Sequence, residues 1–291
     1  MLGLGGIAAT GLLLAGCNYQ GYDVMDPRGP IGRQEWQLLV NATIVMLAVV
    51  IPVIIMTIAF AWHYRAGNPK AKRDLDWDYS GRIEFVVWAI PTLVIVFLGG
   101  VTWVSSHDLD PPKSIESTVA PVEVEVVSLD WKWLFIYPAE GIASVNKLVV
   151  PVGAPIHFRM TSAGVMNTFF VPRLGSMVYT MAGMETQLNL LADEAGTYRG
   201  LSGNFSGEGF SDMVFDTNAL SAADYTQWVQ ATHAAGGTLD AAAYETLMHP
   251  SERESPHTYG GVAPKLFESI LAHPGAAPTA EQIAHFDHPT T

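Results

Sequence analysis

Two long apolar segments dominate the first third of the chain. Residues 38–62, about 25 in number, and residues 85–104, about 20, contain no Asp, Glu, Lys or Arg, and a membrane-spanning helix needs about 20 such residues. Pro52 and Pro91 fall inside these segments, where a membrane helix tolerates proline if neighbouring groups satisfy the freed carbonyl. The pattern therefore predicts a transmembrane hairpin over 38–104, with helices over 38–62 and 85–104.

The loop between the two segments, residues 63–84, is rich in basic residues. It carries Arg65, Lys70, Lys72, Arg73 and Arg82. Positively charged loops stay on the cytoplasmic side of a membrane. We therefore expect this loop to be cytoplasmic, and the chain on either side of the hairpin to lie across the membrane.

A shorter apolar run occupies residues 1–16 and ends in Leu14-Ala15-Gly16-Cys17. This ending resembles the bacterial lipobox, in which cleavage of a signal peptide leaves a lipidated cysteine at the new N-terminus. We predict a signal peptide over 1–16, a palmitoylated lipoprotein anchor at Cys17 and a periplasmic segment over 17–37. The alternative is an incidental cysteine in an ordinary signal peptide. No Lys or Arg precedes the run, as one would in a signal peptide, which indicates a natural start further upstream.

The polarity pattern changes after Pro121 to short alternating runs. Val122, Val124 and Val126 alternate with Glu123 and Glu125, which predicts a half-buried strand. Further strand-like runs cover 148–152, 156–160, 169–171, 188–192 and 213–215, with turns rich in Gly, Pro and Asn between them. Such spacing is typical of an antiparallel sandwich or barrel. Helix formers return over 219–234 and 239–248, and a polar tail follows.

Charge and cysteine content exclude several classes of function. The net charge is −13, which argues against binding to nucleic acid. A single cysteine rules out internal disulfides and zinc sites with several thiolates. The paired acids Glu123 with Glu125 and Asp193 with Glu194 have no histidine or nucleophile nearby in the sequence, and we interpret them as solvated faces. His285 and His288, near the end, are interpreted as tail residues rather than metal ligands.

Several longer runs resemble a known family. They are 128–138 (SLDWKWLFIYP), 140–143, 165–176 (VMNTFFVPRLGS), 179–183 and 196–198, with an aromatic-rich C-terminal stretch that includes Tyr244, Pro250, Ser251, Tyr259, Pro264 and Phe267. These runs are similar to subunit II of the haem-copper oxidases, and most resemble the bo-type ubiquinol oxidases. The resemblance implies a membrane-anchored α+β chain. Its transmembrane hairpin would precede a periplasmic cupredoxin-like antiparallel β-barrel or sandwich over 105–218, and a short helical extension over 219–291.

In the cytochrome c oxidases of this family, a loop C-x-E-x-C-x3-H-x2-M and an upstream histidine hold the dinuclear copper centre CuA. Aligning Met213 with the motif's Met places Ser202 and Ser206 at the two thiolates. Asn204 then stands at the Glu position, Phe210 at the His position and Asn167 at the upstream His. Copper in such sites needs thiolate and imidazole donors. The resemblance therefore implies a cupredoxin domain that has lost CuA, with no metal or other cofactor bound by this chain.

The resemblance also implies partners and roles. The chain would be a redox-inactive subunit of a proton-pumping ubiquinol oxidase in a bacterial inner membrane. Subunit I would carry the haems and CuB, oxidise ubiquinol and reduce oxygen, with subunits III and IV beside it and no cytochrome c. Glu84 matches the glutamate taken to mark the mouth of the K proton channel; otherwise it is an ordinary acid at a helix start. Trp131 and Trp133 would pack against subunit I. The alternative function is a membrane-anchored copper-handling or assembly lipoprotein, which should show Met, His or Cys clusters near the loop.

Overall fold

The computed structural model describes residues 23–72 and 76–284, so the predictions for Cys17, His285 and His288 fall outside the described residues. The chain divides into two compact units. One consists of residues 35–110, and the other combines the segment up to Gln34 with the chain from Pro111 onward. We call the second unit the β domain.

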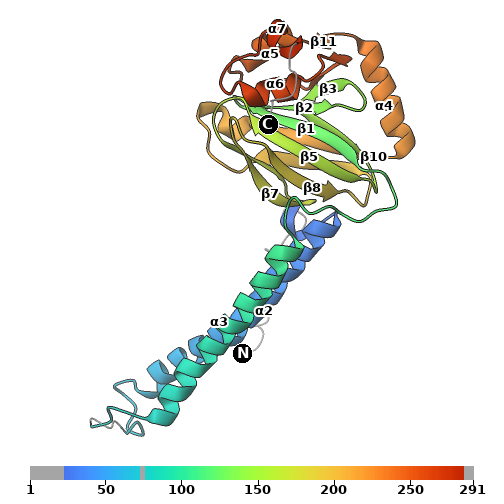
Figure 1. Cartoon of the computed structure of the whole chain (residues 1–291). Helices are drawn as coiled ribbons and strands as arrows, with labels where there is room; N and C mark the ends of the chain where they lie inside the picture. Colours follow the sequence, from blue (N-terminus) through green and yellow to red (C-terminus); the bar gives the residue numbers. More distant parts are fainter. Residues whose placement is uncertain (1–22, 73–75, 285–291) are drawn as a thin grey trace, which may run out of the picture. The chain divides into compact units, whose positions relative to one another are not determined.

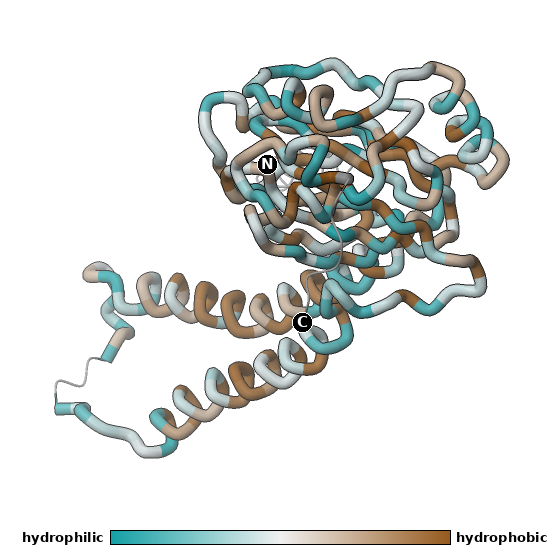
Figure 2. Tube along the Cα trace, turned by 45° about the horizontal axis from the view of Figure 1, so that its top comes forward, coloured by the Kyte–Doolittle hydropathy of each residue, from teal (hydrophilic) through white to brown (hydrophobic). Residues whose placement is uncertain are grey.

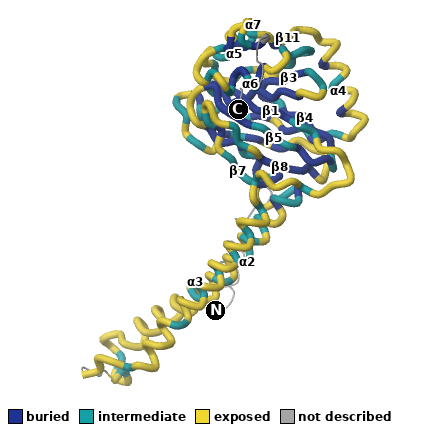
Figure 3. The backbone as a smooth tube through the Cα atoms, in the orientation of Figure 1, coloured by how far each residue is buried: buried dark blue, intermediate teal, exposed yellow. Residues whose placement is uncertain are grey.

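Two long helices, α2 (Pro30–His63) and α3 (Gly81–Asp108), contain the two predicted spans. Both helices are long and apolar enough to cross a membrane. Their residues are exposed along most of the length of both helices (Figure 3), and brown apolar positions surround the helices rather than forming one stripe (Figure 2). Pro52 and Pro91 lie inside the helices, as expected. Helices that are apolar on all sides are typical of membrane spans.

The β domain consists of two mixed sheets and a small third one. Their strands are β1 (Val122–Leu129), β2 (Lys132–Tyr137), β3 (Ile142–Val145), β4 (Lys147–Pro151), β5 (Pro155–Ser162), β6 (Asn167–Val171), β7 (Gly175–Thr180), β8 (Thr186–Leu191), β9 (Gly196–Ser202), β10 (Val214–Leu220), β11 (Thr238–Leu239), β12 (His257–Tyr259) and β13 (Gly261–Val262). The six-stranded sheet has the order β12-β3-β2-β1-β5-β8, the five-stranded sheet β4-β10-β9-β6-β7, and β11 pairs with β13. The predicted cupredoxin-like sandwich is confirmed, and its β1–β5 and β4–β10 pairs are parallel.

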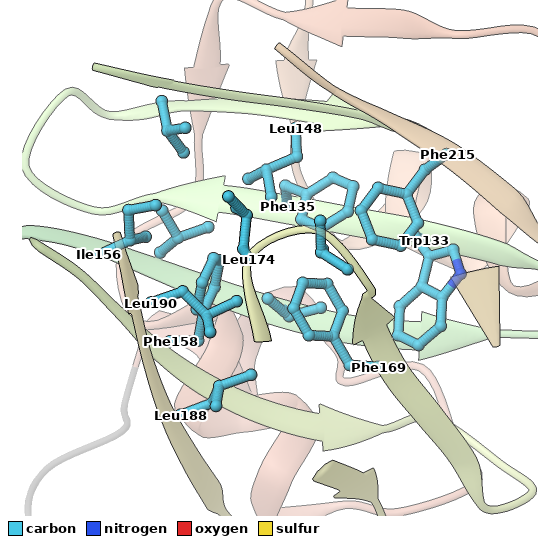
Figure 4. Packing of buried hydrophobic residues seen from close by; sticks show 14 of the residues in the cluster. Trp133, Phe135, Leu148, Ile156, Phe158, Phe169, Leu174, Leu188, Leu190 and Phe215 are labelled. Carbon is cyan, nitrogen blue, oxygen red and sulfur yellow. The ribbon is translucent and has the colours of Figure 1, made fainter. Parts of the chain in front are cut away.

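An aromatic core fills the space between the two large sheets (Figure 4). Trp133, Phe135 and Phe158 from the six-stranded sheet meet Phe169 and Phe215 from the other, with ring centroids 5.1–6.4 Å apart. Phe169 and Phe215 stack with an interplanar angle of 15°. Such aromatic pairs add to the stabilisation from apolar burial.

The C-terminal extension forms a second core on the outer face of the six-stranded sheet. It contains helices α4 (Ala222–Ala235), α5 (Ala241–Met248), α6 (Leu266–Ala272) and α7 (Ala280–Ala284). Figure 1 shows α5, α6 and α7 gathered beside the strands β1, β2 and β3. Tyr244, Leu266, Phe267 and Ile270 are buried with Val127 and neighbouring strand residues. Residues 249–284, interpreted as part of a polar tail, are therefore a packed part of the domain.

Strand β1 is covered on both faces, by the core between the sheets and by the C-terminal extension. Val124 and Val126 face the core between the sheets, whereas Val127 and Leu129 face the C-terminal extension. All residues from Val124 to Leu129 are buried. The prediction of a half-buried strand was wrong for this reason, because the covering extension lies more than 100 residues further along the chain.

The segment before α2 is held against the β domain. The first turn of α2 lies at the turn between β6 and β7, where the Gly32 N–H donates to the Leu174 carbonyl at 2.9 Å. Arg173 binds Asp23 at 2.9 Å, while Arg28 and Arg33 form ion pairs with Glu194 and Asp193. The acids Asp193 and Glu194 are thus ion-paired rather than simply solvated.

Candidate functional site

Two of the residues aligned with CuA ligands lie side by side between β6 and β9. Asn167 begins β6 and Ser202 ends β9, and both are almost completely buried. The Ser202 hydroxyl lies 3.2 Å from Asn167 Oδ1 and 3.3 Å from the Asn204 carbonyl, and it accepts the Thr168 N–H at 3.4 Å. A serine hydroxyl has one proton to donate, so the two oxygens are alternative acceptors. Hydrogen bonds occupy the position where thiolate and imidazole would bind a metal.

The rest of the loop packs around this pair. Met213 is buried in the aromatic core, and its backbone carbonyl accepts the Ser202 N–H at 3.1 Å. The side-chain amide of Asn204 donates to the Met166 carbonyl at 3.2 Å. The structure therefore brings Asn167, Ser202 and Asn204 together, while Met213 joins them through its backbone carbonyl alone.

The other two aligned positions have separate contacts. Phe210 lies in the 3₁₀ helix η3 (Glu208–Asp212) and packs edge-on against Phe205, with centroids 5.7 Å apart. The Ser206 carbonyl accepts the Trp131 indole N–H at 3.0 Å, while the Ser206 hydroxyl is buried without a partner among the described residues. Neither side chain is shown in contact with Asn167 or Ser202.

This donor set does not fit CuA. Hydroxyl and amide oxygens and a phenyl ring lack the soft thiolate and imidazole donors that copper requires. Met213 supplies a thioether, which is a weak ligand when it stands alone. Among residues 23–72 and 76–284, no group of three or more His, Cys, Asp and Glu side chains is placed to hold a metal ion. We therefore derive no electron-transfer step through this position.

The two tryptophans of the 128–138 run have different environments. Trp133 is completely buried between the sheets, against Phe169 and Phe215. The expectation that Trp133 packs against another subunit was wrong, because β2 directs it into the domain core. Trp131 packs against the loop aligned with the copper motif, residues 202–213. A Cβ on Gly209 in this loop would come within 2.5 Å of the Trp131 ring. Its indole N–H donates to the Ser206 carbonyl and so fixes that loop, while the contact of Trp131 with subunit I stays a prediction.

Glu84 lies in the first turn of α3. Its backbone N–H donates to the Ser80 carbonyl at 3.0 Å, and its side chain is exposed. The N-terminus of a helix carries a partial positive charge that favours a carboxylate.

Sequence reasoning missed a charged cluster on the outer face of the six-stranded sheet. Arg159 on β5 pairs in register with Glu125 on β1, and its guanidinium also contacts Glu123, Glu185 and Glu268. Glu125 is only 5% exposed, so its interpretation as part of a solvated face was wrong. Burial, and then the charge of Glu268, raise the pKa of Glu125 to about 8, and Arg159 offsets part of this rise.

A sequence signal for this cluster was available only in part. Glu125 alternates with the core residues Val124 and Val126, so the residues at 123 and 125 were expected to share a face. Nothing in the local sequence shows that Arg159 lies on the adjacent strand or that Glu268 returns to the same place. Both are consequences of tertiary packing.

Comparison with known proteins supports the fold. The profile of the family described as "Cytochrome C oxidase subunit II, periplasmic domain" matches residues 124–219. The profile described as "COX Aromatic Rich Motif" matches residues 233–273, which contain α5, α6 and the buried Tyr244, Phe267 and Ile270.

Individual relatives match over nearly the whole chain. The cytochrome bo(3) ubiquinol oxidase subunit 2 of Pseudomonas aeruginosa is 47% identical over 96% of this chain and 84% of its own. The ubiquinol oxidase subunit 2 of Acetobacter aceti is 48% identical over 92% of this chain and 87% of its own. The corresponding Pseudomonas putida subunit is 48% identical over 89% and 82%. The chain therefore belongs to the ubiquinol oxidase branch of the subunit II family of haem-copper oxidases.

Proposed function

We propose that this chain is a redox-inactive subunit of a proton-pumping ubiquinol oxidase. The observation that carries the proposal is the chemistry of the lost copper site, in a chain 47–48% identical to ubiquinol oxidase subunits over most of its length. Ser202 and Asn167 hydrogen-bond to each other where CuA ligands would stand. A subunit without CuA cannot relay electrons from a water-soluble donor. A quinol dissolved in the membrane, oxidised in subunit I, needs no such relay.

In this proposal the chemistry resides in subunit I, which carries the haems and CuB. The present chain anchors its β domain at the periplasmic face of the inner membrane and stabilises the complex, with subunits III and IV as further partners. Two apolar helices and a periplasmic subunit II domain fit an inner-membrane protein. A lipid on Cys17 would add a second anchor on the same side. The predicted boundaries, with the β domain proper at 105–218 and the extension at 219–291, form part of the proposal.

The test uses the purified complex that contains the full chain. We expect it to oxidise ubiquinol and not reduced cytochrome c, and the isolated full chain in detergent to bind no copper after exposure to Cu(II) and reductant. Two tightly bound coppers with a near-infrared band on the isolated chain would overturn the proposal. They would favour the copper-handling alternative, which no contact among the described residues supports.

Glu84 is proposed as the proton-uptake carboxyl of this subunit. Its position in the first turn of α3, exposed to solvent, supports this role. We expect Glu84→Gln to lower ubiquinol turnover severalfold and to change its pH profile, with Glu84→Asp restoring most of the rate. Asp78→Asn, in the loop that precedes α3, is the matched control and should leave turnover unchanged. Equal turnover in Glu84→Gln and the native complex, at equal assembly, would reject this role.

A further inference from the structure

Helix α6 meets the six-stranded sheet at a single arginine. Nη1 of Arg159 lies 2.9 Å from Glu125 Oε1 and 3.4 Å from Glu268 Oε1, while Nη2 lies 2.8 Å from Glu185 Oε2. The ring of Phe267, next to Glu268 on α6, packs against the guanidinium with its centroid 4.9 Å from Cζ. Arg159 therefore connects α6 to the sheet through both an ion pair and an aromatic contact.

The charges at this junction do not balance. Four carboxylates contact one guanidinium, and three of them reach solvent with side chains 25–44% exposed. The side chain of Glu125 is only 7% exposed. Burying an unbalanced carboxylate is costly, and such a group takes up a proton instead. Glu125, the most deeply buried of the four carboxyl groups, is therefore the one whose ionised form is least favoured.

Groups from every neighbouring element face this cluster. They are Glu123 on β1, Ile136 on β2, His157 and Arg159 on β5, Glu185 before β8, and Lys265 and Glu268 at the start of α6. A cavity of about 180 Å³ beside Glu125 is lined by Glu268 and by the backbone segment that leads into α6. The cavity gives α6 room to shift relative to the sheet.

We propose that Glu125 and Glu268 form a proton-controlled latch that holds α6 against the six-stranded sheet. While Glu125 is protonated, its neutral carboxyl lies beside Arg159, which remains available to the Glu268 carboxylate. When Glu125 ionises, two carboxylates from different elements compete for the same Nη1 atom and repel each other. The contact between α6 and the sheet then loosens. The latch lies wholly within the β domain and needs no partner subunit.

The direction of the pH dependence follows from the proton count. In the closed state the pKa of Glu125 is about 8, whereas in an open, solvated state it would have its ordinary value of 4.5. Between these values the closed state binds more protons than the open state, so opening increases with pH. The opening equilibrium should rise by up to about tenfold per pH unit in this window, and level off above it.

Hydrogen exchange of the full chain in detergent tests the latch. After correction for intrinsic exchange rates, protection of the α6 amides, residues 266–272, should fall as the pH rises from 5.5 to 8. Amides of β4 and β10, in the other sheet, should not follow this slope. Glu125→Gln, an uncharged isostere of the protonated acid, should abolish the slope. Glu268→Gln removes both the carboxylate that binds Arg159 and a charge that raises the pKa of Glu125, and should therefore reduce the slope.

Three outcomes would overturn the latch. One is a slope of the same size in Glu125→Gln, and another is the absence of any slope in the native chain. The third is a slope shared equally by β4 and β10, which would assign the pH effect to the whole domain. If Glu125→Gln does not fold, the exchange slope of Glu268→Gln tests the latch in its place. Glu268 is partly exposed, so its replacement leaves the core intact.

Discussion

The Ser202 hydroxyl lies 3.2 Å from Oδ1 of Asn167. These two residues stand at positions aligned with a thiolate and an imidazole ligand, and both are buried where the end of β9 meets the start of β6. Loss of a metal would leave buried polar groups there without partners, which is unfavourable. The present residues satisfy one another instead. The position has become a structural element of the domain.

This interpretation predicts different effects for the two aligned serines. Ser202→Ala removes the partner of Asn167 Oδ1 and of the Thr168 N–H, and should lower the free energy of unfolding by about 1–2 kcal/mol. Ser206→Ala is the matched control, because the Ser206 hydroxyl is buried without a partner among the described residues. It should be neutral or slightly stabilising. Urea unfolding of the full chain in detergent, followed by near-ultraviolet circular dichroism, measures both. Equal losses of stability in the two variants would contradict the hydrogen bonds assigned to Ser202.

Close packing on β9 gives a second prediction. A Cβ on Gly200 would lie 2.1 Å from the Phe215 ring, whereas a Cβ on Gly196 would meet the Tyr198 ring at 3.5 Å, an ordinary contact. Gly200→Ala should therefore destabilise the domain by about 1–3 kcal/mol through displacement of the aromatic core. Gly196→Ala on the same strand should change stability by less than about 1 kcal/mol. The same unfolding measurement checks the pair, and similar losses in both variants would reject the packing argument.

Local patterns predicted those parts of the fold that depend on nearby residues. The apolar runs predicted α2 and α3, although α2 begins at Pro30 rather than at residue 38. Its first turn packs on the β6–β7 turn, a contact that hydropathy does not reveal. The predicted helix over 219–234 begins at Ala222, because β10 continues to Leu220 and Ser221 caps the helix. The alignment of Ser202 and Asn167 with copper ligands located a pair that lies together.

Long-range contacts account for what the sequence did not predict. The family resemblance assigned Trp133 to a contact with subunit I, and Glu125 was assigned to a solvated face because no histidine or nucleophile lies nearby in the sequence. The residues that bury them come from elsewhere, namely Phe169 and Phe215 for Trp133, and Glu268 with the rest of α6 for Glu125. Strand register places Arg159 opposite Glu125. No local pattern in a single sequence predicts which residues of two strands lie opposite each other.

The buried Lys132 gives a prediction with a pH dependence. Its ammonium group donates to the His249 carbonyl at 2.8 Å and to the Ser251 hydroxyl, and only 2% of the residue is exposed. Lys132→Met should cost about 1–3 kcal/mol, because both acceptors lose a charged donor. Burial lowers the pKa of Lys132 from its ordinary 10.5. The unfolded chain then binds more protons than the folded one, so native stability rises relative to the variant as the pH approaches 10.5.

The measurement compares unfolding of the native chain and Lys132→Met from pH 7 to 10.5. The stability deficit of the variant should widen with pH, and limited proteolysis should cleave the variant first within residues 249–254. Lys147→Met, on β4 and partly exposed, is the control and should leave that segment protected. A deficit that does not change with pH would show that the proton on Lys132 is not linked to folding.

Variants in the segment before α2 and in the first turn of this helix test whether close backbone contact or charge holds the segment to the rest of the β domain. A Cβ on Gly29 would lie 2.3 Å from the Leu191 carbonyl oxygen, so Gly29→Ala must displace the segment or the end of β8. Arg33 and Asp193 form an ion pair with side chains 50% and 31% exposed, and such pairs contribute about 0–1 kcal/mol. We therefore expect Gly29→Ala to destabilise the domain by more than about 1 kcal/mol, and Arg33→Gln to have a smaller effect that disappears at high salt. A Cβ on Gly67 would meet no atom within 4 Å, so Gly67→Ala should leave the free energy of unfolding unchanged. A larger loss in Arg33→Gln than in Gly29→Ala, measured by the same unfolding method, would show that charge holds the segment in place.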